Sequence, residues 1–298
     1  MVGKEAALFV PSGTFGNQLA LFTWCPRGSE VILGEQCHII QHEAGAASII
    51  ASVQTRTVDA PNGILPLSTI EAKIRGLDIH FPPTSLICLE NAHSSGMVMP
   101  LSYMAEVSAL ARKAGLPIHL DGARLFNAAA FLGVDAAQIA GHVDSVMFCL
   151  SKGLCAPVGS MLAGSKDFIA SARRKRKPMG GGWRQAGILA AAGLIALRDM
   201  TKRLPEDHET ALYLAQKLSS IPGFTVQKDI LDINMVFLTL PAWVDGGEFT
   251  AWLAEAGILV NPPEGGLVRF VTHYWVGCDA VDRVAACIAA FVASHGPA

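Results

Sequence analysis

The sequence of 298 residues lacks the features that mark several large classes of protein. It has no basic excess, since 23 Lys and Arg residues face 25 Asp and Glu residues and the net charge is −2. This balance argues against nucleic acid or a membrane surface as a partner. No apolar run is long enough to cross a bilayer, although 51% of the residues are hydrophobic. The richest stretch, residues 186–197, is too short, and we expect it to form a buried helix.

The sequence also lacks paired cysteines. Its seven cysteines are odd in number, contain no Cys-x-x-Cys pair and show no metal-ligand spacing, which excludes a disulfide framework and a zinc site built on them. The first residues resemble neither a secretory signal nor a transit peptide. We therefore expect reduced thiols in a cytoplasmic protein without a bound metal. The high apolar content favours a buried parallel sheet and a subunit interface.

What the sequence does contain is a regular alternation. Short apolar runs, such as residues 84–91 and 116–122, alternate with helix-like segments, such as residues 42–52. This pattern predicts βαβ units, a parallel sheet and an α/β fold. The pattern changes later in the chain, and we expect a large domain over residues 1–203 and a smaller α+β domain over residues 204–298. Parallel sheets bind ligands at the carboxyl ends of their strands.

The first candidate site lies in "VPSGTFGN", residues 10–17. A strand ends there, Gly13 provides a tight turn and Thr14 opens a helix. The free N–H groups of the first helical turn attract an anion, and the hydroxyl of Thr14 adds a donor. An ordinary helix cap after a turn explains the same residues.

Two further strand ends carry charged side chains. Asp121 ends an apolar strand in "HLDGAR", where a buried carboxylate needs a partner. It would also cap a helix that starts at Ala123. Lys152 follows the next strand, so both residues should lie on one edge of the sheet. Arg124 could reach the same crevice.

An anion site, a carboxylate and an amine are the three groups that hold pyridoxal phosphate. Apolar neighbours remove water from the ammonium group of Lys152 and make its amine a usable nucleophile. Asp121 would keep the pyridine nitrogen of the cofactor protonated. A solvated surface lysine and a chance coincidence of the three groups are the alternatives.

Several motifs carry a family resemblance: "HLDGAR" with "FNAA", "FCLSKGL" with "APVGS", and "GGG" with "RQAGILAAAG". The chain resembles the low-specificity threonine aldolases of the β-eliminating-lyase branch of the aspartate-aminotransferase-like (fold type I) pyridoxal-phosphate enzymes. The resemblance runs from residue 3 to the C-terminus. It implies that fold, and it implies that Lys152 carries the cofactor.

The resemblance also implies roles for two histidines. His38 aligns with the imidazole that stacks on the cofactor ring, and His93 aligns with a second histidine of the active site. Imidazole titrates near neutral pH, so either ring could take the proton from the β-hydroxyl of the substrate. Glu90 and Asn91 precede His93 at a strand end and could orient it.

Four cationic residues receive roles in the same way. Arg124 and Arg269 align with the pair that fixes the substrate carboxylate, which a guanidinium group binds in a bidentate manner. Lys177 and Arg184 flank the "GGG" segment and, in the family, reach the phosphate of the neighbouring subunit. This predicts a homodimer or a homotetramer.

The implied activity is retro-aldol cleavage of L-threonine or L-allo-threonine, a small amino-acid substrate, to glycine and acetaldehyde. The family's chains carry an N-terminal arm that packs across the dimer, and we expect this chain to lack it. A catalytically weak or inactive truncated form, which binds the cofactor or pairs with a full-length subunit, is therefore one alternative. Another β-eliminating lyase that uses pyridoxal phosphate is the second.

Overall fold

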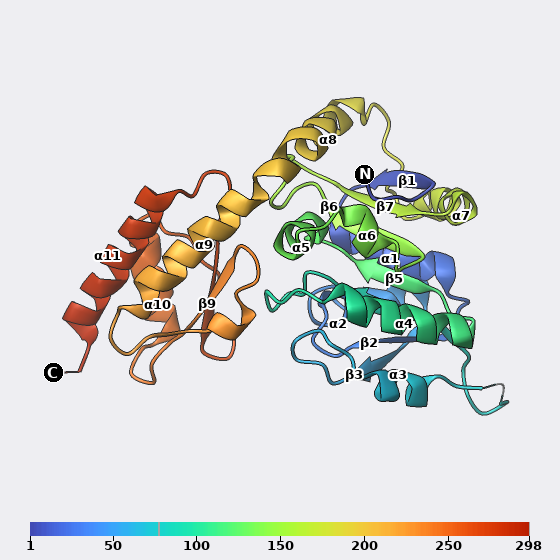
Figure 1. Ribbon diagram of the computed structural model, residues 1–298, viewed down its shortest axis with the longest axis horizontal. Coiled ribbons are helices and arrows are strands. Elements are labelled where there is room, and N and C mark those ends of the chain that lie inside the picture. Colours follow the sequence, from blue (N-terminus) through green and yellow to red (C-terminus); the bar gives the residue numbers. More distant parts are fainter. Residues whose placement is uncertain (77, 298) are drawn as a thin grey trace. The chain divides into compact units, whose positions relative to one another are not determined.

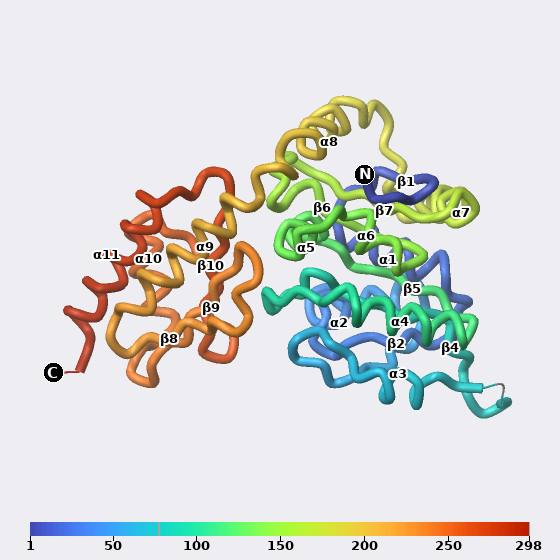
Figure 2. The backbone as a smooth tube through the Cα atoms, viewed as in Figure 1, coloured from blue at the N-terminus to red at the C-terminus, as the bar shows by residue number. Residues whose placement is uncertain are grey.

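The computed structural model describes residues 1–76 and 78–297. The chain divides into two compact units, Met1–Lys202 and Arg203–Ala298, and Figures 1 and 2 trace the chain through each of them. No helix in the described ranges combines the length and the apolar character that crossing a bilayer requires.

The described part of the first unit is built on a seven-stranded sheet with the order β1-β7-β6-β5-β4-β2-β3 (Figure 1). Five neighbouring strands, β6, β5, β4, β2 and β3, run parallel, whereas β7 runs antiparallel to both β6 and β1. The strands are β1 (Ala6–Val10), β2 (Glu30–Gly34), β3 (Gln54–Val58), β4 (Thr84–Glu90), β5 (Ile118–Asp121), β6 (Ser145–Cys149) and β7 (Ser160–Gly164). The predicted mostly parallel α/β sheet is confirmed, although the sequence pattern does not predict β3 or β7.

Helices cover this sheet. They are α1 (Gly13–Trp24), α2 (His38–Gln41), α3 (Leu67–Lys73), α4 (Leu101–Ala114), α5 (Leu125–Leu132), α6 (Ala136–Ala140), α7 (Lys166–Arg176) and α8 (Gly187–Asp199), with a π-helical turn η1 (Ala47–Ala51) and a 3-10 turn η2 (Met200–Arg203). The helix α3 packs on α4, α4 and α5 pack on α6, and α1 packs on α7. Every residue of β2 and β6 is buried, as expected for parallel strands in the middle of such a fold.

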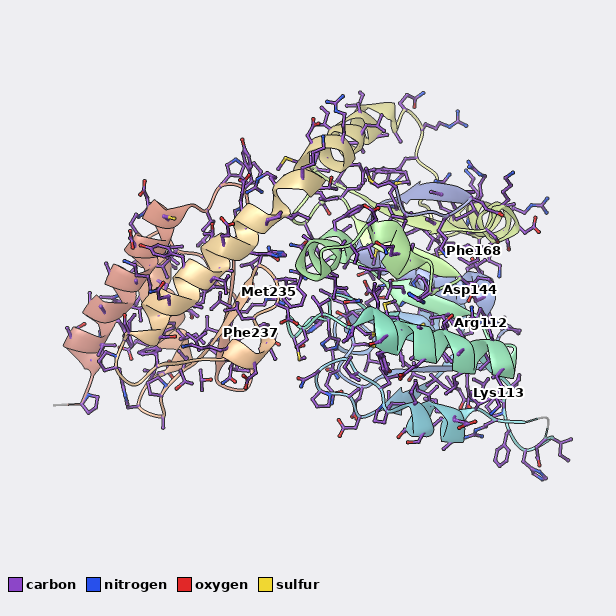
Figure 3. The ribbon with its side chains drawn as sticks, viewed as in Figure 1. Arg112, Lys113, Asp144, Phe168, Met235 and Phe237 are labelled. Atoms are coloured by element: carbon purple, nitrogen blue, oxygen red, sulfur yellow. The ribbon has the colours of Figure 1, made fainter. Side chains whose placement is uncertain are left out.

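Two contacts fix how β5, β6 and α1 lie. Asp144, labelled in Figure 3, joins the starts of β5 and β6, because its Oδ2 accepts a hydrogen bond of 2.7 Å from the amide of Ile118. Trp24 at the end of α1 stacks on Phe168 of α7, with ring centroids 4.7 Å apart. These contacts fix the start of β5 against β6, and α1 against α7.

The helix α8 corrects one prediction. Residues 186–197 are expected to form a buried helix, yet within α8 only Gly193 and Ala196 are buried. Ile188 is 82% exposed and Leu194 is 69% exposed. The helix contacts the rest of the unit along a narrow stripe of small residues, where a Cβ on Gly193 would lie 3.0 Å from Leu150 Cδ1. The side chains of Ile188, Leu194 and Ile195 are therefore exposed, while Leu189 and Leu197 are partly buried.

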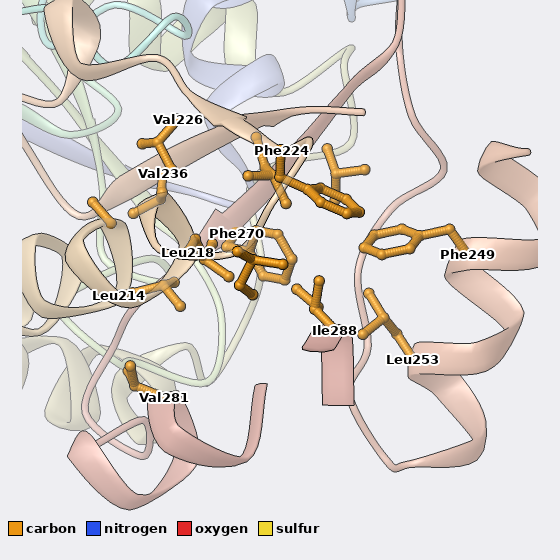
Figure 4. Close-up of a cluster of buried hydrophobic side chains, with 14 of the residues drawn as sticks. Leu214, Leu218, Phe224, Val226, Val236, Phe249, Leu253, Phe270, Val281 and Ile288 are labelled. Atoms are coloured by element: carbon orange, nitrogen blue, oxygen red, sulfur yellow. The ribbon is translucent and has the colours of Figure 1, made fainter. Parts of the chain in front are cut away.

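The second unit is the smaller α+β assembly that the sequence predicts. Its described residues form an antiparallel sheet of order β10-β9-β8. The elements are α9 (Leu204–Ser219), β8 (Thr225–Val226), η3 (Lys228–Ile230), β9 (Met235–Thr239), α10 (Gly246–Glu255), β10 (Leu267–Val271) and α11 (Cys278–His295). Figure 4 shows their shared core, in which Phe249 and Ile288 of the helices meet Phe270 of β10. The unit thus has a hydrophobic core of its own.

Candidate active site

The candidate site lies at the sheet edge where β4, β5 and β6 end. Glu90 and Asp121 are paired across the last positions of β4 and β5, and Asp121 is paired with Met147 of β6. Because β7 runs antiparallel between β1 and β6, Val10 and Cys149 also end at this edge, each paired with Ser160. The structure therefore brings together three of the strand ends that the sequence singled out, and adds that of β4.

The first turn of α1 lies directly on the end of β6. Ser12 is the N-cap and its Oγ accepts a hydrogen bond of 3.1 Å from the amide of Phe15. The helix therefore opens at Gly13 rather than at Thr14. A Cβ on Gly13 would lie 3.0 Å from the Sγ of Cys149, so glycine permits the close approach. The first N–H groups of a helix lack helical acceptors, so those at the start of α1 would attract an anion beside the segment that carries Lys152.

Asp121 is buried, with 1% of its surface exposed, and both carboxylate oxygens have donors. Oδ2 accepts a hydrogen bond of 2.7 Å from Asn17 Nδ2, and Oδ1 accepts one of 3.0 Å from the amide of Ala123. The expected helix cap at Ala123 is wrong, because α5 begins only at Leu125. The bond to Ala123 instead closes the turn before the helix, and it fixes the carboxylate in one orientation.

Lys152 lies in the loop between β6 and the antiparallel strand β7 and is half-buried. Its carbonyl oxygen accepts a hydrogen bond of 2.9 Å from the amide of Cys155. Cys155 has φ of 58°, in the left-handed region that favours glycine. The hydrogen bond to Glu43 raises the pKa of His38 and burial raises the pKa of Cys149, and the charge of Lys152 opposes both shifts, as expected for an amine near the end of β6 and near α2.

His38 is the first residue of α2, and two carboxylates hold it. Its amide donates a hydrogen bond of 2.8 Å to Glu90 Oε2, and its Nδ1 lies 2.9 Å from Glu43 Oε1. The hydrogen bond to Glu43 raises the pKa of His38, against the opposing effect of partial burial. The side chain of Glu43 is itself fully buried.

His93 is buried beside the same strand end. Its Nδ1 accepts a hydrogen bond of 3.1 Å from the amide of Ser95, and its Nε2 lies 3.9 Å from Glu90 Oε2. Burial lowers the pKa of His93 to about 4, while burial and the nearby Asp121 raise the pKa of Glu90 to about 7. Glu90 therefore lies beside His93 as predicted, whereas the side chain of Asn91 does not. Asn91 bonds instead to the backbone of Met99.

The remaining predicted residues are more scattered. Arg124 is half-buried and is the N-cap of α5, three residues after Asp121. Lys177 and Arg184 are exposed. Arg269 belongs to the second unit, where it lines a cavity of about 450 Å³ together with residues that include His273 and Arg283.

A buried polar network behind Asp121 was not predicted from the sequence. Asn17 Nδ2 donates to Glu43 Oε1 at 2.9 Å as well as to Asp121, and Asn17 Oδ1 lies 3.2 Å from His119 Nε2. Burial lowers the pKa of His119 to about 4, so this ring is neutral at physiological pH. A polar residue on the buried side of an apolar helix is the one sequence signal that could have indicated Asn17.

The groups of His38, Glu43 and Asp121 also lie within 4.8 Å of one another, a spacing that a metal ion could bridge. The amide nitrogen of Asn17 lies between the two carboxylates and donates to both of them. An N–H donor in that position is suited to carboxylates and not to a cation. Hydrogen bonding therefore accounts for the cluster.

Comparisons with known proteins identify the family and the fold. The beta-eliminating lyase family matches residues 1–241. A probable low-specificity L-threonine aldolase 2 of Arabidopsis thaliana is 43% identical over 96% of this chain and 83% of its own length. A low specificity L-threonine aldolase of Escherichia coli is 42% identical over 98% of this chain and 86% of its own. A putative L-allo-threonine aldolase structure from Listeria monocytogenes has the same fold, with a TM-score of 0.81 and 22% identity over 97% of this chain and 83% of its own.

Proposed function

The chain belongs to the beta-eliminating lyase family, and we propose that it is a carbon–carbon lyase that uses pyridoxal phosphate to cleave L-threonine or L-allo-threonine to glycine and acetaldehyde. The observation that carries this proposal is the meeting of Lys152, Asp121 and the first turn of α1 at one sheet edge. The close relatives named as low-specificity threonine aldolases support the reaction and the substrate class.

The groups at this edge fit pyridoxal phosphate. The first turn of α1, with Gly13 and the hydroxyl of Thr14, would bind the phosphate. Asp121, held by Asn17 and Ala123, would accept the N–H of the ring, and the amine of Lys152 would bind the aldehyde carbon. Bound in this way, the cofactor withdraws electrons from the Cα of an attached amino acid.

The protein's own residues then direct which bond of the substrate breaks. Arg124 and Arg269 would bind the substrate carboxylate and so orient the Cα–Cβ bond. His38 or His93 would accept the proton of the β-hydroxyl, and the oxygen left behind becomes the carbonyl of acetaldehyde. His38 would also stack on the cofactor ring. A second proton must then reach Cα to give glycine, so the lyase would use binding and two proton transfers, one from the β-hydroxyl and one to Cα.

The released products decide between the reaction classes, and Lys152 tests the attachment of the cofactor. We expect the purified protein loaded with pyridoxal phosphate to show a visible absorbance band and to release acetaldehyde from L-threonine. Lys152→Ala should lose both, and Lys113→Ala, which changes an exposed lysine, should lose neither. Pyruvate and ammonia released from serine, without acetaldehyde from threonine, would show another β-eliminating lyase. A protein that binds the cofactor and turns over no amino acid would contradict the lyase assignment.

A homodimer or homotetramer would complete this site. The exposed apolar residues of α8 and the exposed charges of Lys177 and Arg184 support a subunit interface, where these cations would reach the partner's phosphate. We expect Ile188→Asp to shift the protein to monomers by light scattering, and Ile49→Asp, at another exposed apolar position, to leave the assembly intact. A wild-type monomer saturated with pyridoxal phosphate would refute the interface. The free cysteines support a reducing compartment such as the cytoplasm.

A further inference from the structure

Glu43 has three side-chain partners in the site, although no role has been given to it so far. Its Oε1 lies 2.9 Å from His38 Nδ1 and accepts a hydrogen bond of 2.9 Å from Asn17 Nδ2, and its Oε2 accepts one of 2.6 Å from Gln18 Nε2. The side chain has no exposed surface. A fully buried carboxylate with three donors, one of them a titratable ring in the site, calls for a functional explanation.

We propose that Glu43 is a positioning residue: its carboxylate fixes the ring of His38 as the proton acceptor of the cleavage and, through Asn17, ties that ring to Asp121. This inference rests on the proposed function and adds to it the choice between the two histidines. It also adds a residue that the sequence analysis did not single out.

The contact with Glu43 determines where His38 carries its proton. A carboxylate only accepts hydrogen bonds, so Nδ1 must be the protonated nitrogen and Nε2 keeps the lone pair. A buried carboxylate orients the catalytic imidazole of a serine hydrolase in the same way. Nε2 is then the atom that takes the hydroxyl proton, and the adjacent carboxylate stabilises the imidazolium that forms.

His93 is arranged for the opposite role. The amide of Ser95 donates to its Nδ1, so the neutral ring carries its proton on Nε2. That N–H points into a buried position and makes no hydrogen bond among the described residues. His93 therefore offers a donor where His38 offers an acceptor. A donor can hold an oxygen of the substrate but cannot take its proton.

Asn17 extends the effect of Glu43 to the carboxylate expected to face the cofactor. Its amide nitrogen has two hydrogens, and the structure uses one for Glu43 and the other for Asp121. The backbone after Glu43 also indicates a constrained position. Ala44 has φ of 52°, a left-handed conformation that is unfavourable for a residue with a Cβ, and such strain is concentrated at functional sites.

Groups of both charge signs surround His38, so the effect of Glu43 on this ring must be separated from the effects of the other groups. Asp121 and Glu43 raise the pKa of His38, while Lys152 lowers it. Glu90 contacts the backbone amide of His38, and the exposed ring of His42 lies 5.5 Å away between centroids. Of these groups, Glu43 is the one whose carboxylate bonds to the ring itself.

The test compares three variants of the protein loaded with pyridoxal phosphate. Glu43→Gln removes the charge, but the N–H group of the new amide then faces the N–H group of Gln18, so two donors oppose each other. The double variant Glu43→Gln with Gln18→Glu restores a donor–acceptor match and the net charge while moving the carboxylate away from the ring of His38. Glu106→Gln changes an exposed carboxylate on α4 and is the matched control. The readouts are NMR titration of the His38 ring, thermal unfolding and the pH profile of kcat/KM.

We expect the pKa of His38 to fall by about one to two units in both Glu43 variants. The acid limb of kcat/KM should move to lower pH with it, while the plateau of kcat/KM should fall about tenfold or more, because a weaker and less well oriented base accepts the proton more slowly. The double variant should recover thermal stability without recovering the His38 titration. Unchanged titration in both Glu43 variants would overturn the proposal, as would recovery of wild-type titration and activity by the double variant. If the wild-type protein does not cleave threonine, the proposed function fails, while the titration still decides the role of Glu43.

Discussion

Acid should destabilise the first unit because two buried histidines must remain neutral in it. Burial lowers the pKa of His93 and of His119 to about 4, from 6.5 in an unfolded chain. Between these values the unfolded chain binds protons that the folded chain does not, so stability is lost as the pH falls. At pH 5 this linkage costs about 2 kcal/mol for each histidine.

Glu90 has the opposite effect on stability. Its pKa is raised from 4.5 to about 7, so below pH 7 the folded chain holds a proton that the unfolded carboxyl group releases. Lowering the pH from about 7.5 to 5 therefore raises the unfolding free energy by about 2 kcal/mol through Glu90. The three groups together predict a net loss of about 2 kcal/mol over this range.

Replacing one histidine should reveal this balance. His119→Gln removes one of the two histidines whose titration destabilises the folded chain in acid, and it keeps an amide donor near Asn17. Between pH 7.5 and 5 the unfolding free energy of this variant should therefore fall by about 2 kcal/mol less than that of the wild type. Urea unfolding at the two pH values measures the difference, in which all other titrating groups cancel. His80→Gln, at a side chain that is 77% exposed, should behave as the wild type. An equal acid loss in His119→Gln and in the wild type would refute the reasoning.

A buried ion pair and a close backbone approach provide two further tests. Arg75→Met leaves Glu30, whose side chain is 4% exposed, without the guanidinium 3.1 Å away, and should lower the unfolding free energy by about 2 kcal/mol. Breaking the exposed pair of Lys113 and Glu71 with Lys113→Met should cost less than about 1 kcal/mol in the same denaturation experiment. Gly181→Ala would place a Cβ 2.2 Å from Phe15 Cζ and should lower the melting temperature, at a cost of about 1–3 kcal/mol. Gly182→Ala, which meets nothing within 4 Å, should not lower it.

The sequence predicted the part of the site that depends on strand order alone. Asp121 and Lys152 each follow an apolar run, and the carboxyl ends of parallel strands share one edge, so their proximity needs no knowledge of packing. The same reasoning does not place Arg269, because it belongs to a different compact unit. The prediction that α8 is a buried helix is also wrong. Composition shows that a helix is apolar but does not show which neighbour covers it.

Glu43 shows why other parts of the site could not be predicted. The segment 42–52 has the composition of a helix, and as a helix it would place His42 and Glu43 about 100° apart, with no long apolar stripe to show which of them is buried. The structure instead ends α2 at Gln41 and turns sharply at Ala44, with φ of 52°, before the π-helical turn η1. This turn buries Glu43 and leaves His42 exposed. The difference between the two residues is created by the turn.

The network behind Asp121 has an order that no single residue reveals. Trp24 Nε1 can only donate, so its bond of 2.8 Å makes Ser145 Oγ an acceptor. The order of donors follows from the Asp121 end. The carboxylate only accepts, so Asn17 Nδ2 donates to it and Asn17 Oδ1 accepts from His119 Nε2 at 3.2 Å. The neutral His119 ring then has its lone pair on Nδ1, which lies 2.9 Å from Ser145 Oγ and accepts the hydroxyl hydrogen. The carboxylate that would face the cofactor is thus held by a chain of hydrogen bonds that reaches Trp24 at the far end of α1.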